Sequence, residues 1–502
     1  MNNSDKSMAN SVLAELTKSG KRPDSARWSA ILIASNVFFA SAASATNYYV
    51  HAGVGSNKNS GLQPSSAFAD LGYAMKRLQP GDTLYVRGGV YSSFPGLSQR
   101  NNQSGLQSRP IVVRAYSDEN PVISSGSITT IKDVSWWTFQ GLTFRTSNSI
   151  RLGDRDRLNC LSTASNITFK NNSFEHSSYH ALVLNCATNV TISGNTFDNI
   201  RSRTVGKDAY AILTTASARD VEISKNKFTD IGGDGIQMAG DVRNIDTLSN
   251  EFAILHPYRY RNEQGKVVSS SGSQKFGSVG ENAIDIKGGP GPVNISQNSI
   301  HGFRPTIDGV QDASGADGVA ITLHNGSREL SLTRNHFYNN VIDVKISGQG
   351  DTSSIAYNVF SNSVRADESV YGKTQVPRAV HLTNTSNVRA YNNVFYNSVK
   401  DGKILLYVQD VRNMALQNNV FSGGRMEASR QSSALDIWAD HNAWSDITTE
   451  LDSRFKGPGD VSANDLGVDW STWSLQSGSP LKNAGMHIKN GETDDFYNYQ
   501  FD

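Results

Sequence analysis

The stretch 166-NITFKNNSF-174 contains the pattern that decides the fold: an alternating segment, then Asn, any residue and an aromatic. The same pattern returns through most of the chain at a basal spacing of about 23 residues, with insertions between some copies. A fixed period of this length is the sequence signature of a solenoid. The second-position residues of the pattern are Asn172, Asn195, Asn226, Asn250, Asn298, Asn335, Asn358, Asn393, Asn419 and Asn442.

Each copy of the pattern predicts one coil of a right-handed parallel β-helix. The segments before the Asn, such as 190-VTIS-193, alternate in polarity as half-buried strands do. Stacked coils would bring these strands together at a spacing of about 4.8 Å. We therefore expect each repeated Asn to hydrogen-bond to its neighbours in adjacent coils, with the aromatic stacked inside. The predicted fold class is all-β, a single solenoid of about 10–12 coils.

The two ends of the repeat predict caps. Residues 65–79 have the pattern of a short amphipathic helix, and a first coil is expected at 81–91. The repeat fades after about residue 445. The predicted organisation is a signal peptide at 1–45, the β-helix with its N-terminal cap at 46–445 and a loop-rich C-terminal cap at 446–502.

The N-terminal segment predicts export. Arg27 precedes the apolar run 28-WSAILIASNVFFA-40, and 43-ASA-45 offers a small-x-small cleavage site. The run is too short to span a bilayer, and no later run is apolar enough to do so. We therefore expect a secreted or periplasmic protein without a membrane span.

Charge and cysteine content limit the partners. The formal net charge is +1, and residues 1–45 hold five basic and three acidic side chains, so the mature chain is near −1. This balance argues against a nucleic-acid partner, and any affinity for a polyanion must come from a local site. We expect a monomer.

Cys160 and Cys186 lie about one repeat apart, and an oxidising compartment permits either a disulfide or two stacked thiols.

A further strand follows several of the Asn-x-Phe turns, and its parity predicts which side chains face outward. Its second and fourth residues are apolar and should face the core, because alternate side chains of a strand point to opposite sides. Aligned by parity, Asp343 and Lys345 would recur at the positions of Asp285 and Lys287 two coils later, with His381 continuing the column. We interpret this stack of charges as the floor of a groove. The aligned strands are 235-GIQMA-239, 283-AIDIK-287, 318-GVAIT-322, 341-VIDVK-345 and 379-AVHLT-383.

Two insertions, 254–280 and 301–318, precede this column and could wall a cleft along it. The first contains two Tyr and two Arg residues in succession, which can stack on sugars and pair with carboxylates. An ordinary surface loop is the alternative interpretation of that segment. The residues that we expect to bind substrate are Tyr258, Arg259, Tyr260, Arg261, Arg304, His324, Asp343 and His381.

Several stretches resemble known enzymes. The segment 48–91, which begins YYVHAG, is similar to the N-terminal signature of secreted β-helix polysaccharide lyases, and 475-LQSGSPLKNAG-485 is similar to their C-terminal segment. Between them, 233-GDGIQM-238, 281-ENAIDIK-287 and 342-IDVKISG-348 resemble motifs of pectate lyases of polysaccharide lyase family 9, with the chondroitinase B and alginate lyase group as second choice. The resemblance covers nearly all of the mature chain. It implies an enzyme that cleaves an acidic, uronic-acid-containing polysaccharide by β-elimination.

The resemblance also implies a site. The family holds a calcium ion with oxygen ligands from adjacent coils, which suit a hard cation. The family base is a Lys between apolar residues and Gly, and Lys345 matches that context best, with Lys287 as the competitor. This sequence has Glu281 and Asn282 where the family has two Asp residues, so one formal charge is missing. The implied calcium ligands are Asp234, Glu281, Asn282 and Asp285.

These residue types fit an elimination. It removes the proton at C5 of the uronate and expels the oxygen at C4, and a cation beside the carboxylate acidifies that proton. The base must be neutral when it acts, so a Lys needs a lowered pKa. Two alternatives stay open. One is a hydrolase or C5-epimerase of the same architecture that uses Asp285 and Asp343, and the other is a non-catalytic glycan-binding β-helix.

Overall fold

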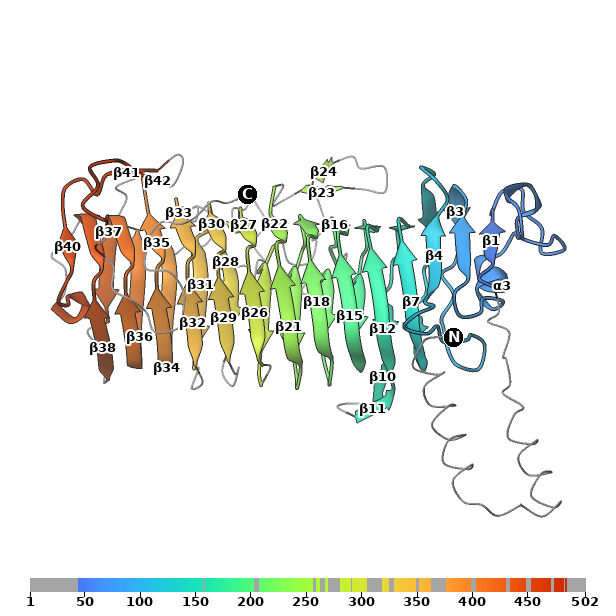
Figure 1. Cartoon of the computed structure of the whole chain (residues 1–502), viewed down its shortest axis with the longest axis horizontal. Coiled ribbons are helices and arrows are strands. Elements are labelled where there is room, and N and C mark those ends of the chain that lie inside the picture. Colours follow the sequence, from blue (N-terminus) through green and yellow to red (C-terminus); the bar gives the residue numbers. More distant parts are fainter. Residues whose placement is uncertain are drawn as a thin grey trace, which may run out of the picture. The chain divides into compact units, whose positions relative to one another are not determined.

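The computed structural model describes most of the chain after the predicted signal peptide (Figure 1). The described ranges are 44–156, 159–202, 207–255, 280–289, 291–304, 318–324, 329–348, 352–362, 376–398, 403–429, 434–447, 453–470, 474–482 and 484, with the backbone of 259–261 and 267–269. The chain divides into the units Met1–Ser44 and Ala45–Asp502, and the described helices and strands belong to the second unit. None of the helices among these residues has the length and apolar character needed to cross a membrane.

The second unit is a parallel β-helix, as the repeat predicts. Each full coil contributes a strand to three faces, and strands of successive coils pair in parallel. Figure 1 shows the strands of the first face side by side. They are β1 (Asn47–Val50), β2 (Thr83–Val86), β4 (Ile111–Ala115), β7 (Val134–Gln140), β12 (Ala164–Lys170), β15 (Ala187–Ser193), β18 (Arg219–Ser224), β21 (Arg243–Leu248), β26 (Val293–Ser296), β29 (Leu330–Thr333), β32 (Ser353–Ala356), β34 (Arg378–Tyr391), β36 (Ile404–Gln417) and β38 (Leu435–Asp440).

The second face follows each Asn-x-Phe turn, and the third face closes the coil. The second face contains β3 (Gly89–Tyr91), β5 (Pro121–Ile123), β8 (Thr143–Phe144), β13 (Ser173–Glu175), β16 (Thr196–Asp198), β19 (Lys227–Thr229), β22 (Glu251–Ala253), β27 (Ser299–His301), β30 (His336–Tyr338), β33 (Val359–Ser361), β35 (Val394–Tyr396), β37 (Val420–Ala428), β39 (Ala443–Ile447) and β40 (Val461–Ser462). The third contains β6 (Thr129–Ile131), β9 (Ile150–Leu152), β14 (Leu182–Leu184), β17 (Ile212–Thr214), β20 (Ile236–Ala239), β25 (Ile284–Lys287), β28 (Val319–Leu323) and β31 (Ile342–Ser347), and then the first halves of β34 and β36.

The repeated Asn residues form a buried ladder, which confirms the prediction. The main-chain N and the Nδ2 of Asn172 both donate to Oδ1 of Asn195, at 2.9 and 3.0 Å. The same pair of bonds recurs at every step up to Asn442. Each Nδ2 also donates to a main-chain carbonyl, such as that of Phe139. Satisfied amides of this kind can be buried without a large penalty, and the ten side chains are at most 2% exposed.

The aromatic of the repeat stacks inside the coils. Ring centroids of Phe174, Phe197, Phe228 and Phe252 lie 4.4–4.9 Å apart, close to the spacing of the strands themselves. Ile300 interrupts the stack, and it resumes from Phe337 to Trp444. The predicted core is therefore confirmed.

The N-terminal cap differs from the prediction of a helix over 65–79. A 3₁₀ turn, η1 (Pro64–Ser66), is followed by α3 (Leu71–Met75), whose cap Asp70 accepts from the main-chain N of Tyr73 at 2.6 Å. Phe68 is extended instead, because its N–H and C=O bond to Tyr49 and His51 beside β1. Since β1 already pairs with β2, the first coil begins before 81–91.

At the C-terminal end, short elements follow the last coils. They are η2 (Ser453–Phe455), β41 (Val468–Asp469) and β42 (Ser474–Leu475), the last two paired antiparallel. Phe455 is fully buried, and Trp470 stacks on Tyr396 of β35 at 4.3 Å. These contacts join the C-terminal segment to the second face.

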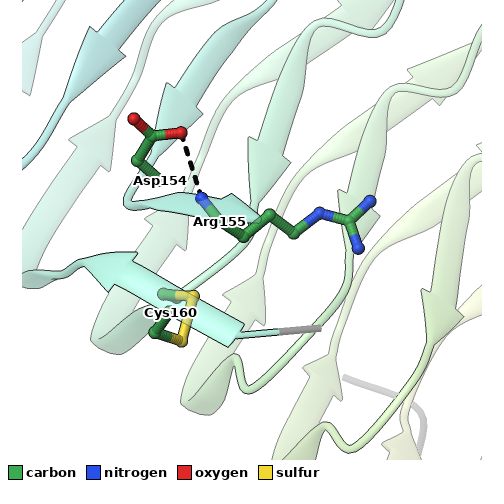
Figure 2. Close-up of a disulfide and its surroundings, with 4 residues drawn as sticks. Asp154, Arg155 and Cys160 are labelled. Carbon is green, nitrogen blue, oxygen red and sulfur yellow. Dashed lines mark hydrogen bonds between the residues drawn. A yellow bond between two sulfur atoms is a disulfide. The ribbon is translucent and has the colours of Figure 1, made fainter. Parts of the chain in front are cut away.

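A disulfide joins Cys160 and Cys186, which decides between the two alternatives for these residues (Figure 2). Cys160 lies in the hairpin of β10 (Asp154–Asp156) and β11 (Asn159–Ser162), which leaves the solenoid between β9 and β12. Cys186 lies in the next coil, directly before β15. Asp154 adds an ion pair with Lys132 at 3.1 Å, so each strand of the hairpin has one contact with the solenoid.

Candidate functional site

The third face carries a column of polar side chains that point outward, which we call the site column. Strand register aligns one of its residues with the next, coil by coil, while the flanking positions, such as Ile284 and Ile286, are buried. The prediction of which residues face outward is thus confirmed for these strands. The site column consists of Gln237, Asp285, Thr322, Lys345, His381 and Tyr407.

The predicted alignment within the column is wrong by two residues. Asp285 pairs with Thr322, and Thr322 pairs with Lys345, so Lys345 and not Asp343 is in line with Asp285. A shift of two residues keeps every side chain on its own side of the strand, so apolar parity could not distinguish the two registers. Lys345 is then followed by His381 one coil later.

Asp343 does not line a groove, contrary to the prediction. Its side chain is fully buried, and its Oδ1 accepts from Nδ2 of Asn340 at 3.0 Å. A buried carboxylate with this partner cannot contact a polymer on the surface. Asp285 and Asp343 both lie in third-face strands, β25 and β31, with buried side chains, and their role as an acid–base pair stays a prediction.

Asp285 is the centre of a charged cluster. It is 1% exposed, yet its Oδ2 lies 2.7 Å from Nζ of Lys287 and its Oδ1 lies 3.1 Å from Nε2 of His324. Burial lowers the pKa of Lys287, but the hydrogen bond and charge of Asp285 and the charges of Asp234 and Glu281 outweigh burial, and the net pKa is raised. A Lys with a raised pKa is a poor general base, which favours the other candidate.

Asp234 lies one coil before this cluster and is fully buried. Its Oδ1 accepts from Nδ2 of Asn282 at 2.8 Å, and its Oδ2 accepts from Nε2 of Gln237 at 2.9 Å. Burial raises the pKa of Asp234 well above its usual value, and the charges of Glu281 and Asp285 raise it further. The coils approach closely here: a Cβ at Gly235 would lie 2.6 Å from a main-chain oxygen of the next coil.

The four predicted calcium ligands therefore lie together, but their arrangement does not fit a calcium ion. Both oxygens of Asp234 accept amide N–H groups, and Oδ1 of Asn282 accepts from Thr322 at 3.1 Å. A cation approaching Asp285 would have to displace Lys287. Among the described residues, no group of three or more His, Cys, Asp and Glu side chains could hold a metal ion. Calcium binding stays a prediction that needs its own experiment.

The sequence interpretation missed two rings next to Asp234. His180 and Tyr210 stack at 4.7 Å, the main-chain N of Tyr210 donates to Nδ1 of His180 at 3.1 Å, and the Tyr210 hydroxyl donates to Asp208 at 3.3 Å. Burial, together with the charge of Arg151, lowers the pKa of His180 to about 4, so this ring is neutral at neutral pH. Burial and nearby carboxylates raise the pKa of Tyr210.

These two rings occupy the same position, directly before a third-face strand, as Asp234 and Asn282 do. Aligning 180-HALVL-184 and 210-YAILT-214 with 234-DGIQM-238 would have found them, because Leu182, Ile212 and Ile236 then coincide and the rings fall at the position of Asp234. The site thus extends two coils further toward the N-terminus than predicted.

The other end of the site column is also aromatic and basic. The ring of His381 meets the ring of Tyr407 edge-on at 4.7 Å, and the guanidinium of Arg378 lies 4.9 Å from the Tyr407 centroid. Burial lowers the pKa of His381 to about 3, and the charges of Arg378 and Lys345 act in the same direction. His381 is therefore neutral at neutral pH. Arg378 and Tyr407 were not predicted, because neither follows the pattern that singled out Lys345.

The predicted wall residues are described only in part. Arg304 is exposed, and its Nε donates to the main-chain O of Asn339 at 3.2 Å. Strand β23 (Arg259–Arg261) pairs antiparallel with β24 (Val267–Ser269), but its side chains lie outside the described residues, as does all of Tyr258. Their predicted contacts with substrate stay predictions.

Comparison with known proteins bears on the fold. Residues 127–254, about a quarter of the chain, match the family model described as the right-handed β-helix region. No curated protein sequence matches the chain. The chain is thus a right-handed parallel β-helix, in agreement with its strand pairing.

Solved structures with similar folds carry different activities. A GH136 lacto-N-biosidase from Eubacterium ramulus is 15% identical, with a TM-score of 0.48 over 74% of this chain and 68% of that one. A mannuronic-acid-specific family 6 lyase from human gut microbiota is 14% identical, with a TM-score of 0.43 over 83% and 82%. Pectate lyase Pel9A is 14% identical, with a TM-score of 0.35 over 89% and 93%. Likeness at this level concerns the fold alone.

Proposed function

We propose that this protein is a polysaccharide lyase that cleaves a uronic-acid-containing polysaccharide by β-elimination along its third face. The observation that carries the proposal is the register of the site column. Lys345 lies two coils from Asp285 and one coil from His381, half-exposed between them. The proposal assigns the base to Lys345, with the Lys287 ammonium on one side and the Arg378 guanidinium on the other as groups able to pair with uronate carboxylates.

Lys345 is favoured over Lys287 as the base by its contacts. The Lys287 ammonium is held 2.7 Å from a carboxylate oxygen, whereas the described part of the chain contains no ion pair between Lys345 and a carboxylate. Lys287 and His324, close to Asp285, instead serve to bind a carboxylate of the polymer.

The proposed elimination is balanced in atoms and electrons. The neutral amine of Lys345 takes the C5 proton, and the electron pair of that C–H bond forms the double bond between C4 and C5. The bond between C4 and its glycosidic oxygen breaks, and this oxygen takes a proton from solvent. The Lys287 ammonium or the Arg378 guanidinium, beside the uronate carboxylate, stabilises the negative charge that develops there. His381, which stays neutral, can hydrogen-bond to a sugar hydroxyl without competing for the carboxylate.

The test is a panel of uronans: pectate, alginate, a glycosaminoglycan and a bacterial exopolysaccharide. Ultraviolet absorbance of the unsaturated product should rise with at least one of them. New reducing ends without that absorbance would establish hydrolysis instead, and a change in uronate composition without cleavage would establish epimerisation. Each reaction should be repeated with EDTA. Loss of activity that calcium restores would confirm the predicted calcium site and show that the arrangement around Asp285 changes when the ion binds.

A further inference from the structure

A different face of the solenoid contains a tryptophan in an unusual backbone conformation. Trp136 lies in β7 with a φ of 60°, in the left-handed region. The residues in register with it on the next coils have the same conformation, and each of them is Asn or Asp. We call this set the corner row. It consists of Trp136, Asn166, Asn189, Asp220 and Asn244.

The conformation suits the other members of the corner row and not Trp136. Asn and Asp adopt left-handed backbone readily, whereas other residues with a Cβ lose about 1–2 kcal/mol there. Side chains in the row also bond to one another, as Nδ2 of Asn244 does to Oδ1 of Asp220 at 2.8 Å. An Asn at position 136 would therefore stabilise the folded state more than Trp136 does.

The neighbouring segment holds the Trp136 backbone in place. The main-chain N of Gly105 donates to the carbonyl of Ser135 at 2.8 Å, and Nε1 of Trp137 donates to the carbonyl of Gln103 at 3.0 Å. A Cβ at Gly105 would lie 2.4 Å from the Trp136 carbonyl, so the two segments are in close contact. The contacts with residues 103–105 keep Trp136 in its strained backbone conformation. Backbone strain that is maintained by its surroundings points to a functional role for the Trp136 side chain.

Trp136 lines a cavity of about 520 Å³ on the first face. Its floor crosses β7, β12, β15, β18 and β21, which lie side by side in Figure 1. The floor residues are in register along one outward column, and the corner row forms one edge. A volume of this size suits a small ligand or a short oligomer. The floor consists of Thr138, Thr168, Thr191, Glu222 and Asp246.

The lining specifies the chemistry of the ligand. Threonine hydroxyls, Asn amides and the carboxylates of Asp220, Glu222 and Asp246 can accept hydrogen bonds from sugar hydroxyls, and the indole offers an apolar face for a sugar ring. The three carboxylates would repel a polyanion such as a uronan. No Lys or Arg is among the described residues that line the cavity, whereas Lys287, Lys345 and Arg378 accompany the carboxylates at the site column.

We propose that the first face carries a separate binding groove for neutral oligosaccharides, with Trp136 as the ring on which a sugar stacks. This groove lies on a different face from the site column and does not depend on the function proposed for that column. Its role is to bind a neutral glycan while the third face handles an acidic one.

The experiment is calorimetric titration of the mature protein with neutral 4-linked hexasaccharides of glucose, mannose, xylose and galactose, and with a hexauronate. At least one neutral hexasaccharide should bind. In Trp136→Asn its affinity should fall about tenfold or more, because loss of the stacked ring removes roughly 1.4 kcal/mol. The melting temperature of this variant should stay the same or rise, so a binding loss cannot be attributed to misfolding. Trp136→Phe should retain part of the affinity.

Trp438 provides the matched control. It lies in β38 on the first face, in the same outward column as the groove floor but many coils away, and it is 53% exposed. Trp438→Asn should bind the hexasaccharide as well as the unmodified protein does. The proposal is overturned if no neutral hexasaccharide binds, if Trp136→Asn retains full affinity, if Trp438→Asn weakens binding equally, or if the hexauronate competes for the same groove.

Discussion

The asparagine ladder and the site column are both stacks of polar side chains along the solenoid, but they are built in opposite ways. The ladder repeats one residue at every coil, buries it and pairs each amide with the next. The site column changes residue at every coil, from Gln237 to Tyr407, and leaves Lys345 and His381 half-exposed. Repetition of the same residue indicates that the ladder stabilises the stacking of the coils. The change of residue along the column indicates that its side chains are not needed for stacking and can serve a functional site.

Replacing Lys345 should give the largest effect. Lys345→Ala should reduce kcat on the responsive uronan by about 10²–10⁴-fold, the usual contribution of a general base. Stability to urea should be unchanged, because Lys345 is half-exposed and belongs to the column. The matched control is Lys287→Ala, which should raise KM more than it lowers kcat. The reverse pattern, with Lys287 essential and Lys345 dispensable, would refute the assignment of the base.

Breaking the ladder should give the largest effect on stability. Asn298 accepts two hydrogen bonds from Asn250 and donates two to Asn335. Asn298→Ala leaves buried partners unsatisfied, so the free energy of unfolding should fall by about 2–4 kcal/mol in urea titrations. In the same coil, Asn294 points outward on β26 and is only half-buried. Asn294→Ala should change stability by about 0.5 kcal/mol or less, and equal losses in the two variants would contradict the distinction.

Lowering the pH should reduce stability through the histidines on the outside of the coils. The ladder should not contribute to this loss, because its amides do not titrate. Burial lowers the pKa of His336 and His180 to about 4 and that of His381 to about 3. Between these values and about 6.5 the unfolded chain binds more protons than the folded one, so stability must fall as pH falls. Urea titrations at pH 7 and pH 4.5 should show this loss. His336→Gln, on the second face and away from the site column, should make the loss smaller. A stability that is the same at both pH values would contradict the environments described for these rings.

The same contrast explains what the sequence could and could not predict. The ladder, the aromatic stack and the direction of the side chains were predictable, because most coils from Asn172 to Asn442 impose the same local requirement on the Asn, the aromatic and the alternating strand. The register of Asp285 with Lys345 was not, since a two-residue slip leaves the apolar pattern intact. The partners of Phe68 beside β1 depend on contacts between distant segments that no local pattern encodes. Asp343 lies on the side of β31 that its parity predicts, but its burial beside Asn340 could not be predicted from the alternation alone.

The smallest effect should come from the ion pair at the edge of the site column. His324 is 50% exposed, and its Nε2 lies 3.1 Å from Asp285. Since the His324 end of this pair is half-exposed and Lys287 remains 2.7 Å from the buried Asp285, His324→Ala should leave the free energy of unfolding nearly unchanged. KM for the uronan should rise, because a group that helps to bind a carboxylate has been removed. A loss of stability of about 2 kcal/mol or more would mean that this part of the column holds the coils together as the ladder does, and that its charges are structural and not catalytic.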